Sequence, residues 1–229
     1  MGPSRSDHPG VQISAAMLLA FGAGFVDTVG FVGLFGLFTA HVTGNFVLIG
    51  ASLVQQRPGV IVKLLALPIF VLVVIATRLW VRRCERRGRP LQRGLLLIQI
   101  VLLGGFLLAG IKASPIVDAD ATWAIAAGLL GVAAMGTQNA ASRLAFPNLP
   151  PTTVMTGNVT QVVIDLVDLL SRAAGADAIR ARFVKMAPAV LAFAVGAILG
   201  ALGIANIGFL CLLCPMTVLG VAMLLVKRG

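Results

Sequence analysis

Residues 39–50 read Thr-Ala-His-Val-Thr-Gly-Asn-Phe-Val-Leu-Ile-Gly, and residues 152–163 read Thr-Thr-Val-Met-Thr-Gly-Asn-Val-Thr-Gln-Val-Val. Both stretches carry the polar tripeptide Thr-Gly-Asn between long apolar segments. Thr156 follows Thr43 by 113 residues, about half of the 229-residue chain. A polar tripeptide repeated at this distance indicates two copies of one unit. Repeated units of membrane proteins commonly place their binding site where the copies meet.

The composition identifies an integral membrane protein. Hydrophobic residues make up 59% of the chain and charged residues only 11%, with a mean hydropathy of +1.00. In soluble domains about a quarter of the residues are charged. The 18 Lys and Arg residues outnumber the 8 Asp and Glu residues, but the basic ones gather at the ends of apolar segments. This is the positive-inside distribution, so we expect a lipid bilayer as the partner and no nucleic acid.

Apolar segments of two lengths occur along the chain. A helix that crosses a bilayer needs about 20 apolar residues. After the two tripeptides the apolar parts are short, nine residues at 46–54 and twelve at 159–170, within the segments 39–56 and 152–171. The long segments are 13–36, 61–81, 94–111, 122–143, 183–204 and 207–226.

Charge indicates how the short segments sit in the membrane. Residues 82–93 contain six arginines against Glu85, and residues 172–185 contain four basic residues against Asp177. Both loops are therefore expected in the cytoplasm. If every segment crossed, three crossings would separate the loops and put them on opposite sides. We predict instead about six transmembrane helices plus two re-entrant Thr-Gly-Asn hairpins, with cytoplasmic N- and C-termini.

The predicted fold is an all-α inverted-topology repeat. Each half crosses the membrane three times, so the second half must be inserted upside down relative to the first. The tips of the two hairpins are then expected to meet near the midplane. The predicted divisions are a polar tail at 1–12, repeat 1 at 13–111, an extracytoplasmic loop at 112–121, repeat 2 at 122–226 and a tail at 227–229.

The tripeptides contain the residue types that an interruption of a helix at membrane depth requires. Glycine adopts positive φ or permits close approach, and asparagine caps the start of a helix. Two helix starts that face each other would suit an anion or a neutral polar solute. The same residues also fit a plain helix-packing motif. The candidate substrate-binding residues of the hairpins are Thr43, Gly44, Asn45, Thr156, Gly157 and Asn158.

Asp27 and His41 are two further candidate site residues. An ionisable side chain such as Asp27 within a membrane span is a functional candidate by default. It could carry a proton, bind a cation or pair with Arg78 or Arg143. His41 stands two residues before Thr43 and titrates near neutral pH, although a packing or capping role fits equally well.

Gln138 and Asn139 complete the predicted cavity. They form a polar pair inside an apolar segment, and such a pair is expected to face protein or a cavity rather than lipid. Gln99 is a lone polar residue in another span, where an interhelical hydrogen bond is expected. Asp165 and Asp168 follow the second tripeptide, and we expect them to be solvated near the cytoplasmic surface.

The motifs resemble those of the YoaK family of bacterial inner-membrane proteins, also called domain of unknown function 1275. The resemblance rests on Gly24-Phe-Val-Asp27 with Phe38-Thr-Ala-His-Val-Thr-Gly-Asn45, and on Gly136-Thr-Gln-Asn139-Ala-Ala-Ser-Arg143 with Thr153-Val-Met-Thr-Gly-Asn158. It covers roughly residues 12–226 and implies about six spans, without an established substrate. The two motif pairs also give Asp27 and Asn139 related positions in the two halves.

The sequence predicts a transporter or channel rather than an enzyme. Only His8 and His41 are available as histidine ligands, and H-E-x-x-H, Walker A and G-x-S-x-G motifs are missing, so neither a metal site nor a cofactor is expected. The predicted site for a small-molecule solute lies at the midplane between the hairpins. The alternative is a non-transporting scaffold or regulator that binds a protein through the basic loop 82–93. A homo-oligomer is compatible with either function.

Overall fold

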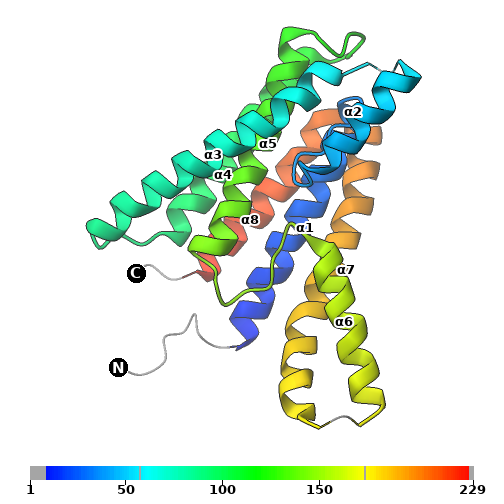
Figure 1. Ribbon diagram of the computed structural model, residues 1–229. Coiled ribbons are helices and arrows are strands. Elements are labelled where there is room, and N and C mark those ends of the chain that lie inside the picture. Colours follow the sequence, from blue (N-terminus) through cyan, green and yellow to red (C-terminus); the bar gives the residue numbers. More distant parts are fainter. Residues whose placement is uncertain (1–8, 57, 173, 227–229) are drawn as a thin grey trace.

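The computed structural model describes residues 9–56, 58–172 and 174–226, and these residues form an all-α protein (Figure 1). The predicted tails at residues 1–8 and 227–229, and Arg57, lie outside the described residues. The helices are α1 (Pro9–Gly33), α2 (Gly44–Gln55), α3 (Val60–Arg86), α4 (Gln92–Ala113), α5 (Thr122–Leu144), α6 (Met155–Leu170), α7 (Ala176–Ile207), the 3-10 turn η2 (Gly208–Leu212) and α8 (Leu213–Leu225).

Among the described residues, five helical stretches are long and apolar enough to cross a membrane: Gly10–Gly33, Val60–Arg86, Gln92–Ala113, Thr122–Leu144 and Ala176–Leu225. The chain is therefore a multi-pass membrane protein. Aliphatic side chains on the outside agree with this assignment, since Leu72 is 59% exposed, Leu191 67% and Leu224 74%. Such side chains need lipid around them rather than water.

The last stretch combines two segments that the sequence separated, 183–204 and 207–226. The helical chain continues through η2, where Gly208 has a φ of +60°, and then reverses direction (Figure 1). Phe209 of η2 packs on Gly110 near the end of α4. At the other end of α8, Val226 O accepts a hydrogen bond of 2.9 Å from Arg93 Nε near the start of α4. Helix α8 thus runs antiparallel to α4.

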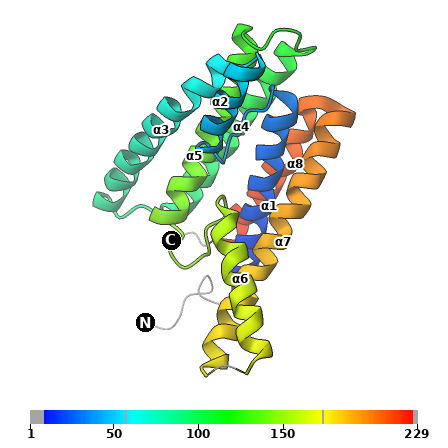
Figure 2. The ribbon, with the colours of Figure 1, turned by 45° about the vertical axis from the view of Figure 1, so that its right-hand side comes forward.

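The helices that follow the tripeptides are the short ones. Helix α2 has 12 residues and α6 has 16, and neither is among the candidate spans. Helix α6 packs along α7. Together α6 and the first part of α7 project beyond the other helices, at the end of the bundle where α1 begins (Figures 1 and 2). The 32 residues of α7 extend about 48 Å, more than the hydrocarbon thickness of about 30 Å.

Helix α1 packs on α7 and α8, whereas α5 packs on α3 and α4. Glycines permit the close contact between α1 and α7, because a Cβ on any of three glycines would overlap backbone atoms of the other helix. These glycines are Gly24, Gly196 and Gly200, which face the backbones of Phe193, Phe21 and Phe25 in turn. Close backbone approach through small residues is the usual way in which membrane helices associate.

Candidate functional site

Residues 34–43, here called the first fold-back segment, return along α1 after that helix ends. The chain turns at Phe35 and Gly36, where φ is +52° and +79°. Thr39 of the returning chain then lies beside Gly30 of α1. A Cβ atom added at Gly30 would come within 2.7 Å of the Thr39 methyl carbon. The glycine in α1 therefore makes room for the returning chain.

Asp27 holds the first fold-back segment against α1. Its Oδ1 accepts hydrogen bonds from the backbone nitrogens of Thr39 and Ala40, both at 2.7 Å, and from Thr39 Oγ1 at 3.3 Å. Its Oδ2 lies 2.6 Å from His41 Nδ1. The carboxylate is only 4% exposed. Both oxygens are thus occupied by groups of this chain.

The partner of Asp27 is His41, not one of the arginines considered from the sequence. Among the described residues, Arg78 pairs with Glu85 at 3.4 Å, and His41 forms the ion pair of Asp27. Arg143 is exposed at the end of α5. The sequence could not place His41 beside Asp27, because the contact depends on the chain folding back over 14 residues.

The His41 ring also connects the fold-back segment to α7. It lies edge-on to the ring of Phe38 at 6.0 Å between centroids and to the ring of Phe193 at 5.9 Å. Phe193 belongs to α7, so the imidazole contacts α1, its own segment and α7 together.

Asn45 fixes the turn between the first fold-back segment and α2. Its Oδ1 accepts a hydrogen bond from Phe38 N at 3.0 Å, and its Nδ2 donates to Phe38 O at 2.9 Å. The side chain is 1% exposed. This paired contact satisfies the donor and the acceptor of one backbone residue at a position where no helix provides partners.

Residues 145–154, the second fold-back segment, form a related turn after α5. Asn158 Nδ2 donates to Pro151 O at 2.6 Å, across the same interval of seven residues as in Asn45 and Phe38. Thr153 Oγ1 donates to Asn139 Oδ1 of α5 at 2.7 Å. Asn139 therefore contacts the second fold-back segment as Asp27 contacts the first.

Contrary to the prediction, neither Asn45 nor Asn158 caps the start of a helix. Helix α2 begins at Gly44 after Thr43, and α6 begins at Met155 after Val154, with no side-chain cap at either start. Asn45 and Asn158 lie inside the helices and reach back to earlier carbonyls instead. Each asparagine bonds within its own segment, and no hydrogen bond among the described residues joins the two segments.

The glycines and threonines of the tripeptides also differ from expectation. Gly44 and Gly157 are helical and have no positive φ. A Cβ at Gly44 would touch the Phe38 ring at 3.0 Å, whereas one at Gly157 would meet nothing within 4 Å. Close approach is thus needed in the first copy alone. Thr43 and Thr156 are exposed, as is Gly157.

Gln138 joins α5 to three other parts of the fold. Its Oε1 accepts a hydrogen bond from Gln99 Nε2 at 2.6 Å, and its Nε2 donates to Leu19 O at 2.8 Å and to Thr152 Oγ1 at 3.0 Å. The predicted interhelical hydrogen bond of Gln99 and the inward position of Gln138 are confirmed. The role of Thr152 was missed, although it follows Thr39 by the same 113 residues that separate the tripeptides.

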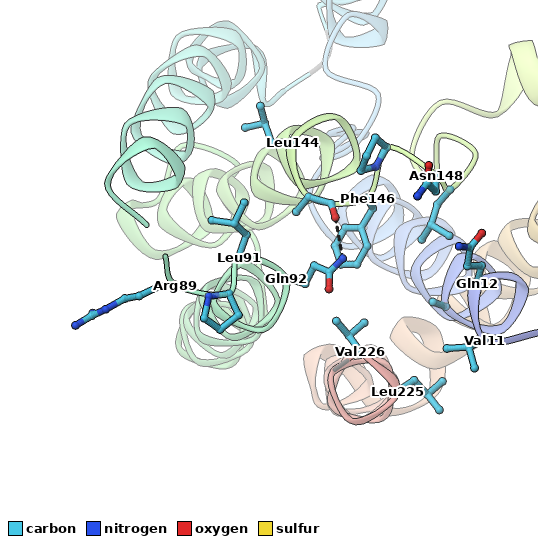
Figure 3. A pocket seen from close by; sticks show the side chains of 15 residues that line it. Val11, Gln12, Arg89, Leu91, Gln92, Leu144, Phe146, Asn148, Leu225 and Val226 are labelled. Atoms are coloured by element: carbon cyan, nitrogen blue, oxygen red, sulfur yellow. Dashed lines mark hydrogen bonds between the residues drawn. The ribbon is translucent and has the colours of Figure 1, made fainter. Parts of the chain in front are cut away.

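A cavity of about 510 Å³, here called the vestibule, opens beneath the second fold-back segment (Figure 3). It lies between the start of α1, residues 89–92, residues 144–149 and the end of α8. Phe146 and Leu149 line it and also line a space of about 10 Å³ beside Gln99 and Gln138. That inner space is at the lower size limit for one water molecule, so little room is left between the vestibule and the side chains of Gln99 and Gln138.

Asp165 is part of the structure of the α6–α7 projection. Its side chain is fully buried, contrary to the solvated position expected. Arg182 donates from Nε to Asp165 Oδ2 at 2.9 Å, and Gln161 Nε2 donates to Oδ1 at 2.8 Å. The hydrogen bond from Arg182 lowers the pKa of Asp165 below its ordinary value. A buried carboxylate paired in this way stiffens the hairpin of α6 and α7.

Comparison with known proteins gives a family without an activity. The model of the family described as "Protein of unknown function (DUF1275)" matches residues 15–225. Neither a curated protein nor a solved structure matches the chain. The resemblance seen in the motifs is therefore confirmed at the level of the family, and the function has to be argued from the geometry.

Proposed function

The chain belongs to the YoaK-type family of unknown function, DUF1275, and from its two fold-back segments we propose that it transports a small polar solute across a membrane. The observation that carries this proposal is the repeated turn in which Asn45 and Asn158 each reach a carbonyl seven residues earlier. Broken helices at matching positions of two repeats are a frequent feature of transporter binding sites.

The proposed topology has six crossings, made by α1, α3, α4, α5, α7 and η2 with α8. Residues 208–225 extend about 30 Å if η2 rises about 2 Å per residue and α8 about 1.5 Å, which is enough for a sixth crossing. Each fold-back segment, with the short helix after it, forms a re-entrant hairpin. Irregular backbone at this depth is acceptable because it is buried in protein.

The packing of the helices supports an inverted repeat. If α1, α3 and α4 correspond to α5, α7 and α8, the contacts of α1 with α7 and α8 correspond to those of α5 with α3 and α4. Helix α2 packs on α3 as α6 packs on α7. The first helix of each half thus packs on the last two helices of the other half.

The basic ends give the proposed orientation. The turn between α3 and α4 and the turn between α6 and α7 lie at the same end of the bundle, opposite the loop at residues 114–121 (Figure 1). Arg82, Arg83 and Arg86 are exposed near the first of these turns. By the positive-inside rule this end faces the cytoplasm of a bacterial inner membrane.

The proposed transporter is a carrier rather than an open channel. The vestibule opens at the basic end, and the interior beyond Phe146 and Leu149 offers only about 10 Å³. On the opposite side the first fold-back segment is held to α1 by Asp27. A site accessible from one end and closed toward the other is expected of alternating access.

The test is solute flux into proteoliposomes that contain the purified protein. Swelling is followed by light scattering in isotonic urea, glycerol and formate, before and after a bulky maleimide is attached to Thr156→Cys at the start of α6. The background has Cys84, Cys211 and Cys214 replaced by alanine. We expect protein-dependent entry of at least one solute, and loss of that entry after labelling.

The matched control is Val117→Cys, which lies in the loop between α4 and α5 and is 89% exposed. Labelling there should leave the flux unchanged. Transport of solutes of this size is refuted if none of the three enters faster than into empty vesicles, or if labelling at both positions has the same effect.

A further inference from the structure

Neutral amide groups from three parts of the chain line the vestibule. Gln12 comes from α1, Gln92 from α4 and Asn148 from the second fold-back segment (Figure 3). Among the described residues, the carboxamides of Gln12 and Asn148 make no hydrogen bond, and Gln92 uses its Nε2 for Ala145 O at 3.0 Å. Donors and acceptors therefore remain for a ligand. The volume of about 510 Å³ lies within the usual range for small-molecule pockets.

The charges around the vestibule argue against an ionic ligand. No acidic or histidine side chain lines it among the described residues, so a cation has no counter-charge. Arg89 is the charged side chain of the lining, and it points away from the cavity into open space (Figure 3). Arg93 is not part of the lining and donates from Nε to Val226 O, so the described lining itself presents no cationic side chain to an anion.

Helix dipoles do not favour an ion either. The starts of α1 and α4 bring positive helix ends to the vestibule, and the ends of α5 and α8 bring negative ones. The partial charges at helix ends are similar in size and opposite in sign. They offset one another here, so the helix dipoles by themselves do not select a charge.

The remaining walls are apolar. Phe146, Leu225 and Val226 line the cavity beside the amide groups (Figure 3). A ligand that satisfies both surfaces has a hydrogen-bonding head and a short hydrocarbon part.

We infer that the vestibule binds a small neutral amphipathic molecule bearing an amide or hydroxyl group, held by Gln12, Gln92 and Asn148. This inference rests on the proposed function in one respect, because it takes such a molecule to be the solute that the protein transports. The glutamine cluster beyond Phe146 repeats the same chemistry, since Gln99, Gln138 and Thr152 offer amide and hydroxyl groups.

The test compares three compounds of one size that differ in charge: butyramide, butyrate and butylammonium. The full chain carries Val11→Cys in the cysteine-free background, in lipid nanodiscs, and N-ethylmaleimide labelling at this wall of the vestibule is timed. Butyramide at ten times its dissociation constant should slow labelling about tenfold, and the two ions should not. Arg89→Gln should keep this protection.

The variants Gln12→Leu and Gln92→Leu should each weaken protection by butyramide. Gln12→Leu is the safer one, because Gln12 makes no hydrogen bond in the described protein, whereas Gln92 holds Ala145 O. The inference is overturned if butyrate protects as well as butyramide and Arg89→Gln abolishes that protection. It is also overturned if none of the three compounds protects.

Flux of the same compounds separates this inference from the proposed function. Protection by butyramide, with entry into proteoliposomes no faster than into empty vesicles, supports the binding site and overturns the transport role. Entry of butyramide without protection supports transport and overturns the vestibule as its binding site.

Discussion

Asp27 is a buried carboxylate whose partners all come from one short segment, so its replacement tests what holds that segment in place. The variant Asp27→Asn keeps the volume but removes the charge that Thr39 N, Ala40 N and His41 share. We expect a loss of about 2–3 kcal/mol in the free energy of unfolding, because hydrogen bonds to charged groups are the stronger ones. Unfolding of the purified protein in mixed micelles measures it.

The control for Asp27→Asn is the same change at Asp120, which is exposed in the loop before α5. Asp120→Asn should alter the free energy of unfolding by less than about 0.5 kcal/mol. Equal losses in the two variants would show that Asp27 does not hold the first fold-back segment.

The two tripeptide asparagines should contribute unequally to stability. Asn45 exchanges two hydrogen bonds with Phe38. Asn158 makes one with Pro151, which has no N–H to donate, and a weak one with Met155 Sδ at 3.6 Å. Asn45→Ala should therefore destabilise the protein by about 1 kcal/mol more than Asn158→Ala. The same unfolding assay ranks the variants. A larger loss at Asn158 would contradict the assigned contacts.

At the scale of the helix, the contact between α1 and α7 depends on Gly24. A methyl group there overlaps the backbone carbonyl of Phe193. Gly24→Ala should destabilise the protein by about 1–3 kcal/mol, the usual cost of overpacking. The control, Gly22→Ala, adds a methyl that meets nothing within 4 Å, so it should be neutral or slightly stabilising. Similar thermal unfolding of the two variants would disprove this helix contact.

The α6–α7 projection should respond to acid. Because the folded-state pKa of Asp165 is lowered, the stability from its pair with Arg182 is fully present above the ordinary carboxyl pKa. It is lost as pH falls through the lowered value. The difference in thermal stability between the native chain and Asp165→Asn should thus be largest near neutral pH and shrink on acidification. A difference that stays constant down to the lowest pH reached would refute the ion pair.

For the whole molecule, the packing predicts which loops share a side of the membrane. In the cysteine-free background, Arg87→Cys and Ala178→Cys should react from the cytoplasm, and Asp118→Cys from outside. Two crossings separate the first two positions in the proposed topology, so they stay together. Opposite labelling of Arg87→Cys and Ala178→Cys would remove the inverted repeat, while leaving the observed contacts of the fold-back segments intact.

The sequence predicted much of this arrangement because apolar length and charge act over whole segments. It identified the family, the membrane class, the short helices after the tripeptides and the inward position of Gln138. It did not predict the pairing of Asp27 with His41, the burial of Asp165 or the reach of Asn45 back to Phe38. These contacts depend on where an irregular segment returns in space, which neither periodicity nor composition encodes.

The vestibule could not be predicted for a similar reason. Its lining combines residues from α1, residues 89–92, the second fold-back segment and α8, and only the tertiary fold brings them together. The candidate site at the midplane stays a prediction. The vestibule lies instead nearer the basic end, beneath one of the two predicted hairpins.

The length of α7 has a practical consequence for imaging. A membrane protein of 23.7 kDa buried in a detergent belt offers electron microscopy almost no outside feature for aligning particles. The tip of the α6–α7 projection, whose two helices are joined by Asp165 and Arg182, is such a feature. An antibody fragment raised against it, or a helical fusion spliced into its turn, would give each particle a recognisable marker that reports the orientation of the bundle.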